Sequence, residues 1–315
     1  MNTPDSRREI TLSMETKADF ATKGTEIPSR ILLALSQDYA KIDTDGLQQP
    51  FYNCYIPNIY RFAGEYYNTR EKYPDNGNRV YIFGYAPENT LSSNDNFKTL
   101  TPNYGSLYNN SLWENILLCG PVSGNKSSHV NTPLVYSHPV SRFRFLAFKE
   151  ESMVNYHVKH VVLKAGYEIV PYKLAWDKTS GMWKPQTMEN TGIGFTFKDQ
   201  NAVEILGLGR ENALEMGPYY LMPREGNNIG PFSIEATYYI EGDQSSEKVY
   251  SKENVYLTIS SDRSGNPVSR INAGEDYVML IRFNQDSFTL SGVRLDDWED
   301  GGNIIIPIIN ETTDW

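Results

Sequence analysis

Two histidines, His157 and His160, are the closest approach in this sequence to a metal-ligand pair. They lie three residues apart in HVKHVVLK, a segment whose β-branched content predicts a strand. Successive side chains of a strand point to opposite faces, so an offset of three places the two imidazoles on opposite sides of the sheet. We therefore interpret them as ordinary strand histidines.

The acidic run DDWEDGG, residues 296–302, suggests calcium, because Ca²⁺ takes several oxygen ligands from a flexible loop. The run lacks the alternating acidic spacing of a calcium loop, and a solvated turn between strands is the better interpretation. The glycine pairs Gly192/Gly194 and Gly207/Gly209 lack the third glycine of a dinucleotide-binding loop. We predict neither a metal nor a cofactor.

Motifs for covalent or hydrolytic catalysis are missing, since neither GxSxG nor HExxH occurs. Carboxylate pairs that cleave glycosides meet only in the fold, and no pair stands out in the sequence. The aromatic segment FYNCYIPNIYRF, residues 51–62, is followed by EYY, residues 65–67, and such rings could stack on sugars. Clusters of this kind more often pack in cores and at strand edges. We predict a protein that is not an enzyme.

The composition of the chain bears on the remaining classes of function. The formal net charge of −10 opposes nucleic-acid binding, which requires clustered Lys and Arg. Cys54 and Cys119 lie far apart without CxxC spacing, and either one disulfide or two buried thiols is compatible with the sequence. No apolar stretch reaches the length of a membrane helix, about 18 residues. The opening MNTPDSRRE reads like a polar leader, and we expect any natural export signal to lie outside the given chain.

The elements that must position these residues are strands. Short β-branched and aromatic runs alternate with clusters of Gly, Pro, Asn and Asp. The clear candidates are residues 10–15, 30–35, 79–85, 115–119, 141–148, 157–164, 194–197, 219–222, 232–240, 255–259, 277–283, 287–295 and 303–308. In SRFRFLAF, Phe143 and Phe145 point one way and Arg142 and Arg144 the other.

One-sided strands of this type need cover from a second sheet, so the pattern predicts an all-β protein of two-layer sandwiches. The chain of 315 residues exceeds the size at which single cores stop growing, about 250 to 300 residues, which favours two domains. The loop GPVSGNKSSHVNTP is the best junction. We place the domains at residues 1–130 and 131–315.

Seven segments, taken in order, resemble the fimbrillin-like proteins of Bacteroidales, the subunits of type V pili. They are YNTREKYPDNGNRVYIFGYAPE, WENILLCGP, TPLVYSHPVSRFRFLAF, HVKHVVLKAG, GPYYLMPREG, INAGEDYVMLIRF and DSFTLSGVRLDDWEDGG. The most specific pieces are SHPVSRFRF, YYLMPREG and AGEDYVMLIRF with the terminal W-x-x-GG. The resemblance runs from about Ile10 to Ile308.

The resemblance implies two tandem transthyretin-like β-sandwich domains and a structural, adhesive role in a fimbria on the bacterial surface. The precursor would be exported as an outer-membrane lipoprotein, and a protease would remove its first strand, commonly after arginine. A strand of a neighbouring subunit would then fill the open groove, which is β-strand addition. The implied partners are other pilus subunits, the processing protease, and a host glycan or protein.

The N-terminus fits this scheme in part. Residues 10–15 would be the removable strand, with Ile10, Leu12 and Met14 on one face. The matching cleavage position falls after Lys17, before Ala18, where the family commonly has arginine. The next arginine, Arg30, begins a predicted core strand. Either another protease acts at Lys17, or this member keeps its first strand.

The C-terminal tail NIIIPIIN is the second candidate for strand exchange. Alternation in residues 303–309 places three isoleucines on one face: Ile304, Ile306 and Ile308. Ile305 and Ile309 make the other face apolar, and Pro307 restricts such a strand to a sheet edge. We expect this tail to lie on the C-terminal sandwich in the monomer and to leave it to complete a neighbour's groove.

Two other functions compete with the fimbrial interpretation. The tyrosine and tryptophan content would suit a glycan-binding β-sandwich module of the cell surface. A β-sandwich glycosidase is the less favoured alternative, because only scattered carboxylates support it.

Overall fold

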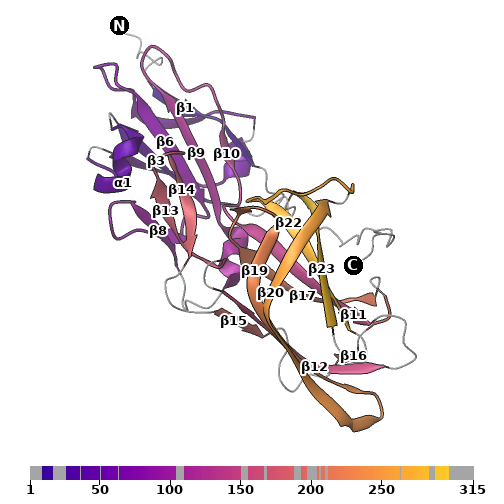
Figure 1. Cartoon of the computed structure of the whole chain (residues 1–315). Coiled ribbons are helices and arrows are strands. Elements are labelled where there is room, and N and C mark those ends of the chain that lie inside the picture. The colour runs from indigo at the N-terminus through magenta and orange to yellow at the C-terminus, as the bar shows by residue number, and fades with distance from the viewer. Residues whose placement is uncertain are drawn as a thin grey trace. The chain divides into compact units, whose positions relative to one another are not determined.

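The computed structural model describes residues 9–16, 26–35, 37–49, 51–62, 64–103, 110–149, 155–166, 169–187, 193–196, 204–205, 207–209, 212–262, 264–283 and 288–297. The chain forms two compact units (Figure 1). Unit 1 comprises Met1–Pro139 and Tyr172–Gln186, and unit 2 comprises Val140–Pro171 and Thr187–Trp315. Nearly all described secondary structure is strand, so the all-β prediction is confirmed.

The centre of unit 1 is a four-stranded antiparallel sheet in the order β4-β3-β6-β9. Its strands are β3 (Ser29–Leu35), β4 (Phe51–Ile56), β6 (Val80–Ala86) and β9 (Leu117–Gly124). Consecutive residues of β3, Ile31 to Ala34, are all fully buried. Since neighbouring side chains of a strand face opposite ways, both faces of this sheet are covered.

Short strands cover the first face. They are β1 (Glu9–Leu12), β2 (Met14–Thr16), β5 (Tyr67–Lys72) and β10 (Leu134–Tyr136). Their inward side chains join those of the central sheet in one hydrophobic cluster, which includes Ile31, Leu33 and Ile82. The N-terminal segment is therefore part of the core of unit 1.

A second sheet, in the order β14-β13-β8-β7, covers the other face. Its strands are β7 (Leu91–Ser92), β8 (Thr99–Pro102), β13 (Pro171–Asp177) and β14 (Met182–Thr187). Trp176 and Trp183 meet the ring of Phe83 edge-on, with centroids 5.1 and 5.3 Å away. The indole Nε1 of Trp183 donates to the carbonyl of Phe97 at 2.8 Å, so the buried polar atom is satisfied.

The limits of the units differ from the domain boundary expected at residues 130 and 131. Residues 131–139 lie in unit 1, because β10 pairs with β2 there. The hairpin of β13 and β14 also belongs to unit 1, although the strands that flank it in sequence belong to unit 2. Contacts between aromatic side chains, rather than the local turn composition, decide this division.

Unit 2 contains a nine-stranded sheet with the path β15-β12-β19-β20-β23-β22-β11-β17, and β16 pairs with β12. Its strands are β11 (Ser141–Lys149), β12 (Tyr156–Ala165), β15 (Ile193–Thr196), β16 (Glu204–Ile205), β17 (Leu214–Leu221), β19 (Asn228–Ile240), β20 (Asp243–Asp262), β22 (Glu275–Phe283) and β23 (Phe288–Asp297). Side chains from both ends of this path share one core, among them Phe143, Val161 and Met279. The two halves of the sheet thus face each other as a sandwich.

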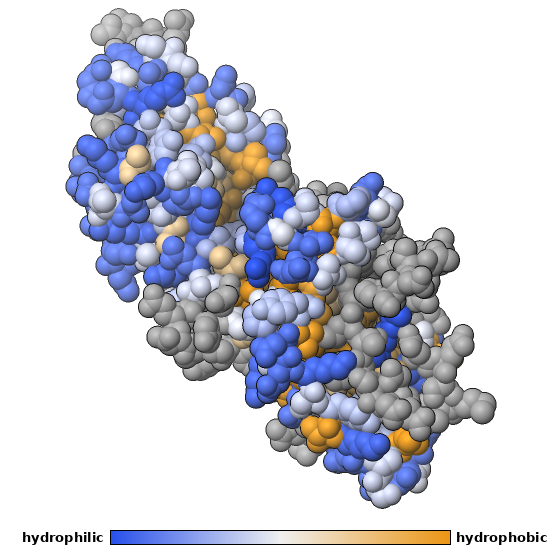
Figure 2. Space-filling model, viewed as in Figure 1, coloured by the Kyte–Doolittle hydropathy of each residue, from blue (hydrophilic) through white to orange (hydrophobic). Residues whose placement is uncertain are grey.

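The remaining described elements are small. They are η2 (Tyr39–Lys41), α1 (Ile42–Asp45), η3 (Ile59–Phe62), η4 (Asn110–Asn115), β18 (Arg224–Glu225) and β21 (Arg270–Ile271). Among the described residues, no helix is long and apolar enough to span a membrane. In the face drawn in Figure 2, hydrophilic residues cover most of the described surface of unit 1, and hydrophobic residues are visible along one side of it.

Substitution of Trp183 tests the role of the hairpin. Trp183→Ala should destabilise unit 1 by about 3 to 5 kcal/mol, because it leaves a cavity against Phe83. Hydrogen exchange of the β6 amides would measure the loss. The control is Lys184→Ala, whose exposed side chain forms an ion pair with Asp177. Equal exchange in the two variants would contradict a structural role for the hairpin.

Candidate functional site

The first described segment, residues 9–16, lies in the core of unit 1. Its three apolar side chains are almost inaccessible, with exposed fractions of 0% for Ile10, 1% for Leu12 and 0% for Met14. Thr11 and Ser13, which alternate with them, are only partly buried. The structure therefore brings together on one inner face the three N-terminal residues that the sequence predicts for strand exchange.

Backbone pairing changes partner halfway along this segment. β1 pairs antiparallel with β5, and β2 pairs parallel with β10. Between them, the carbonyl of Ser13 accepts a hydrogen bond from the amide of Leu134 at 2.9 Å. We call β5, β10 and the core side chains around Ile10, Leu12 and Met14 the first-strand seat. In Figure 1, β1 and β10 are labelled in unit 1.

Two polar side chains of β5 also hold the segment. Thr69, which is 7% exposed, donates from Oγ1 to the carbonyl of Ile10 at 2.8 Å. The side-chain amide of Asn68 donates to the carboxylate of Glu9. No local sequence pattern marks either residue, because each lies 59 positions away from its partner.

Apolar burial is the larger part of the attraction. The side chains that share a cluster with the first strand include Ile27, Ile31, Leu33, Ile56, Ile59, Tyr73, Val80, Ile82, Ala86, Leu117, Cys119, Leu134 and Tyr136. Burying an aliphatic side chain of this size contributes about 1.5 to 3 kcal/mol. An empty seat would expose three such sites and their linings to water.

Two hydroxyl groups are hydrogen-bonded to each other within this apolar core. The hydroxyl of Tyr136 and the Oγ of Ser29 are hydrogen-bonded at 2.6 Å, and burial raises the pKa of Tyr136 well above its usual value. Gly84 makes room for this contact. A Cβ at that position would lie 2.7 Å from the Sγ of Cys119, 2.7 Å from the Cδ1 of Ile31 and 3.0 Å from the Tyr136 hydroxyl.

The cysteines are two free thiols. Cys54, Ile31, Gly84 and Cys119 form one row across the central sheet, so two strands separate the sulfur atoms. Neighbouring strands lie about 4.8 Å apart, whereas a disulfide requires Cα atoms closer than about 7 Å. Desolvation, reinforced by the charge of Glu71, raises the pKa of Cys54 to about 11. Burial also raises the pKa of Cys119, so neither thiol is activated as a nucleophile.

Of the processing residues expected from the sequence, only Arg30 lies among the described residues. Lys17 and Ala18 lie outside the described residues. Arg30 lies within β3, where it is paired with Tyr55 of β4 and Tyr85 of β6. Its guanidinium forms an ion pair with Glu88 and lies over the ring of Tyr55, 5.7 Å from the centroid. A protease would have to open the central sheet to cut after Arg30.

The expected donor residues of the tail, Ile304, Ile306 and Ile308, lie outside the described residues. The described part of the chain ends with β23, which pairs antiparallel with β22. Its last residue, Asp297, is opposite Glu275. In the sequence, residues 298–302 separate this strand from the tail.

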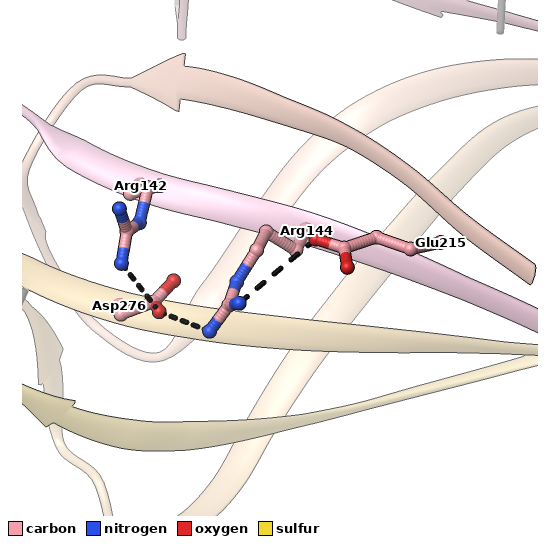
Figure 3. Close-up of polar contacts among 4 residues, drawn as sticks. All are labelled: Arg142, Arg144, Glu215 and Asp276. Atoms are coloured by element: carbon pink, nitrogen blue, oxygen red, sulfur yellow. Dashed lines mark hydrogen bonds and ion pairs between the residues drawn. The ribbon is translucent and has the colours of Figure 1, made fainter. Parts of the chain in front are cut away.

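Unit 2 contains a buried charged cluster, drawn in Figure 3. Oδ2 of Asp276 accepts from Nη2 of Arg142 at 3.0 Å and from Nη2 of Arg144 at 2.5 Å. Glu215 of β17 lies 3.9 Å from Arg144. The alternation in β11 predicts that both arginines face away from the phenylalanines, and the structure confirms this. Asp276 was not predicted as their partner, since β11 and β22 pair only in the fold.

This cluster is a structural feature rather than a reactive site. It links two parallel strands, and the side chains that continue the same face are apolar: Leu146, Phe148, Val278 and Leu280. Elsewhere in the described chain, His157 stacks on Tyr239 with centroids 5.1 Å apart. No group of three or more His, Cys, Asp or Glu among the described residues is arranged to hold a metal ion.

Comparisons with known proteins give similarity only at the level of structure. No family model matches the chain, and no curated protein matches it. A putative cell adhesion protein from Bacteroides uniformis has a TM-score of 0.49 and 10% identity, over 92% of this chain and 98% of that one. A fimbrial protein from Bacteroides vulgatus has a TM-score of 0.47 and 14% identity, over 91% and 99%.

A third similar structure is the tip fimbrial protein Mfa3 from Porphyromonas gingivalis with a C-terminal truncation. Its TM-score is 0.43 at 10% identity, over 92% of this chain and 100% of that one. These solved structures are described as cell adhesion or fimbrial proteins.

The charged cluster yields a prediction for unit 2. Asp276→Asn should destabilise it by about 3 to 5 kcal/mol, because two buried guanidinium groups lose their shared counter-charge. Glu215→Gln is the matched control: this carboxylate is 45% exposed, and its loss should cost less than about 1 kcal/mol. Denaturant unfolding measures both variants. Similar midpoints would show that the cluster does not stabilise unit 2.

Proposed function

We propose that this chain is a structural, adhesive subunit of a fimbria on the bacterial surface and polymerises by strand exchange. The first strand leaves its seat in unit 1, and a strand of a neighbouring subunit replaces it. The observation that carries this proposal is the segment 9–16 itself, which fills a core by three alternate side chains and pairs with two separate strands. The role is non-enzymatic.

The chemistry of the seat defines the replacement strand. It must carry apolar side chains at three alternate positions, because the pockets of Ile10, Leu12 and Met14 are apolar and closed. It must also run in the same direction as residues 9–16 to be antiparallel to β5 and parallel to β10. Main-chain pairing then supplies register, and the side chains supply most of the free energy of binding.

The C-terminal tail of a second copy meets these requirements. Alignment in the same direction places Ile304, Ile306 and Ile308 in the three pockets. In this register Pro307 takes the position of Ser13. The hydrogen bond recorded there uses the carbonyl of Ser13, which accepts from Leu134, and a proline retains that carbonyl. The proline that restricts the tail is thus compatible with this one register.

Removal of the first strand is the second half of the proposal. Cleavage between Lys17 and Ala18 would detach the segment that fills the seat, whereas Arg30 is protected inside β3. We propose a protease that accepts lysine as the processing enzyme. We further propose that the precursor is exported as an outer-membrane lipoprotein. If the first strand is retained, the chain would instead be a terminal or anchor subunit.

Assembly can be tested with a specific protease site inserted between residues 17 and 25. Cleavage should convert the monomer into polymers visible by size-exclusion chromatography and electron microscopy. Ile306→Asp and deletion of residues 303–315 should each abolish polymers, because a charge or a gap replaces an apolar contact.

The matched control is Ile305→Asp, which in the proposed register takes the half-exposed position of Thr11 and should still polymerise. Polymers of the tail deletion would exclude the tail as donor strand. Cleaved, intact chains that remain monomeric would exclude strand exchange altogether.

Glycan binding is the second candidate, and one observation favours it. Three tyrosines of the aromatic segments 51–62 and 65–67 are exposed: Tyr52 by 40%, Tyr55 by 46% and Tyr66 by 72%. The ring of Tyr55 lies beside the ion pair of Arg30 and Glu88, and rings flanked by charged hydrogen-bonding groups suit sugar hydroxyls.

A glycan array with the uncleaved monomer tests this candidate. Saturable binding that falls at least tenfold in Tyr55→Ala would support a sugar site on unit 1, since a stacking ring contributes a large share of such contacts. Tyr256→Ala is the control, because Tyr256 is 60% exposed but belongs to unit 2. Absence of binding, or equal loss in both variants, would count against it.

A further inference from the structure

Strand β5 carries a bulge directly opposite the first strand. The pairs that flank it are Glu9 with Lys72 and Thr11 with Asn68. Between these pairs one residue of β1, Ile10, faces three residues of β5, 69–71. A regular antiparallel ladder would place one residue opposite one, so two extra residues of β5 are accommodated at this point.

The bulge holds Arg70 in a strained backbone conformation. Its φ is +64°, in the left-handed region where a side chain crowds the carbonyl oxygen. The residue is exposed, so no buried contact of its side chain offsets the strain. Strain of this kind persists only where the surrounding structure imposes it, and it concentrates at functional sites.

The hydrogen bonds of the bulge are mostly internal. The amide of Arg70 donates to Oδ1 of Asn68 at 2.8 Å, and the amide of Glu71 donates to Oγ1 of Thr69 at 3.1 Å. These two amides therefore do not bind the first strand. The contact across the bulge is the Thr69 hydroxyl, which donates to the carbonyl of Ile10 at 2.8 Å.

We infer that this bulge is a built-in release point for the first strand, an inference that rests on the proposed strand exchange. The buried side chain of Ile10 anchors β1 in the core. Opposite Ile10, β5 contacts the β1 backbone through the hydroxyl of Thr69 and carries the strained residue Arg70. When the strand leaves, β5 is free to relax at Arg70. The inference places this strain in the closed state alone, where the Thr69 hydroxyl is also bound to Ile10, so the strain favours opening.

The test measures opening of the first strand in the intact, uncleaved chain. Hydrogen exchange followed by mass spectrometry reports on the amides of residues 9–12 without any need for polymers. Arg70→Gly should slow their exchange about threefold, because glycine adopts positive φ without strain. Thr69→Val, of the same shape, should speed it roughly tenfold, because the hydrogen bond to Ile10 is lost.

Asn254→Gly is the matched control. Asn254 has a φ of +56° in β20 of unit 2, so its replacement removes a side chain from a left-handed position elsewhere in the chain and should leave residues 9–12 unchanged. Unchanged exchange in Arg70→Gly, or a change spread evenly over all of unit 1, would overturn the release point. Altered exchange together with failure of cleaved chains to polymerise would support the release point and reject the proposed function.

Discussion

The central sheet of unit 1 is apolar on both faces, and the remainder of that unit exists to cover it. Four consecutive residues of β3 are fully buried, which is possible only if both sides are shielded from water. The N-terminal segment covers part of one face, and the hairpin of β13 and β14 covers part of the other. The hairpin comes from a part of the chain far from β3 in the sequence.

The two covers differ in how they are attached. Two indole rings fix the hairpin against Phe83. The first strand is held by three buried side chains, but its pairing is divided between β5 and β10 and is interrupted by a bulge. A cover with strong side-chain anchoring and an irregular backbone ladder is suited to replacement by another strand with the same alternation. This contrast is the physical basis of the proposed exchange.

In unit 2, charged side chains rather than apolar ones occupy part of a buried sheet face. The outer face of β11 and β22 is buried, and its two arginines share Asp276 as their counter-ion. Such clusters contribute little net stability compared with apolar packing, yet they penalise any arrangement that separates the partners. Here the shared aspartate favours parallel pairing of β11 with β22 in the register that places Arg142 opposite Asp276.

Local sequence patterns determined much of the strand structure and side-chain orientation of this protein. The alternation in residues 10–15 and 141–148 predicts which side chains share a face, and the structure confirms both groupings for the described residues. The expectation that residues 141–148 have only one buried face is wrong, because Leu146 and Phe148 are buried on the face of the arginines. Periodicity works there because a strand repeats every two residues whatever its neighbours are. The same reasoning could not find Thr69, Asp276 or the bulge at Arg70. It also could not assign the hairpin of Trp176 and Trp183 to unit 1.

Those features depend on contacts between residues 59 to more than 130 positions apart, and chain proximity carries no information about them. The free thiols illustrate the difference. The sequence left a disulfide open, and the tertiary structure excluded it, because strand order places two strands between Cys54 and Cys119. The sequence by itself determined which faces are apolar, since that is a property of each strand. Only the tertiary structure decided which strands cover which faces, because that choice is made by long-range packing.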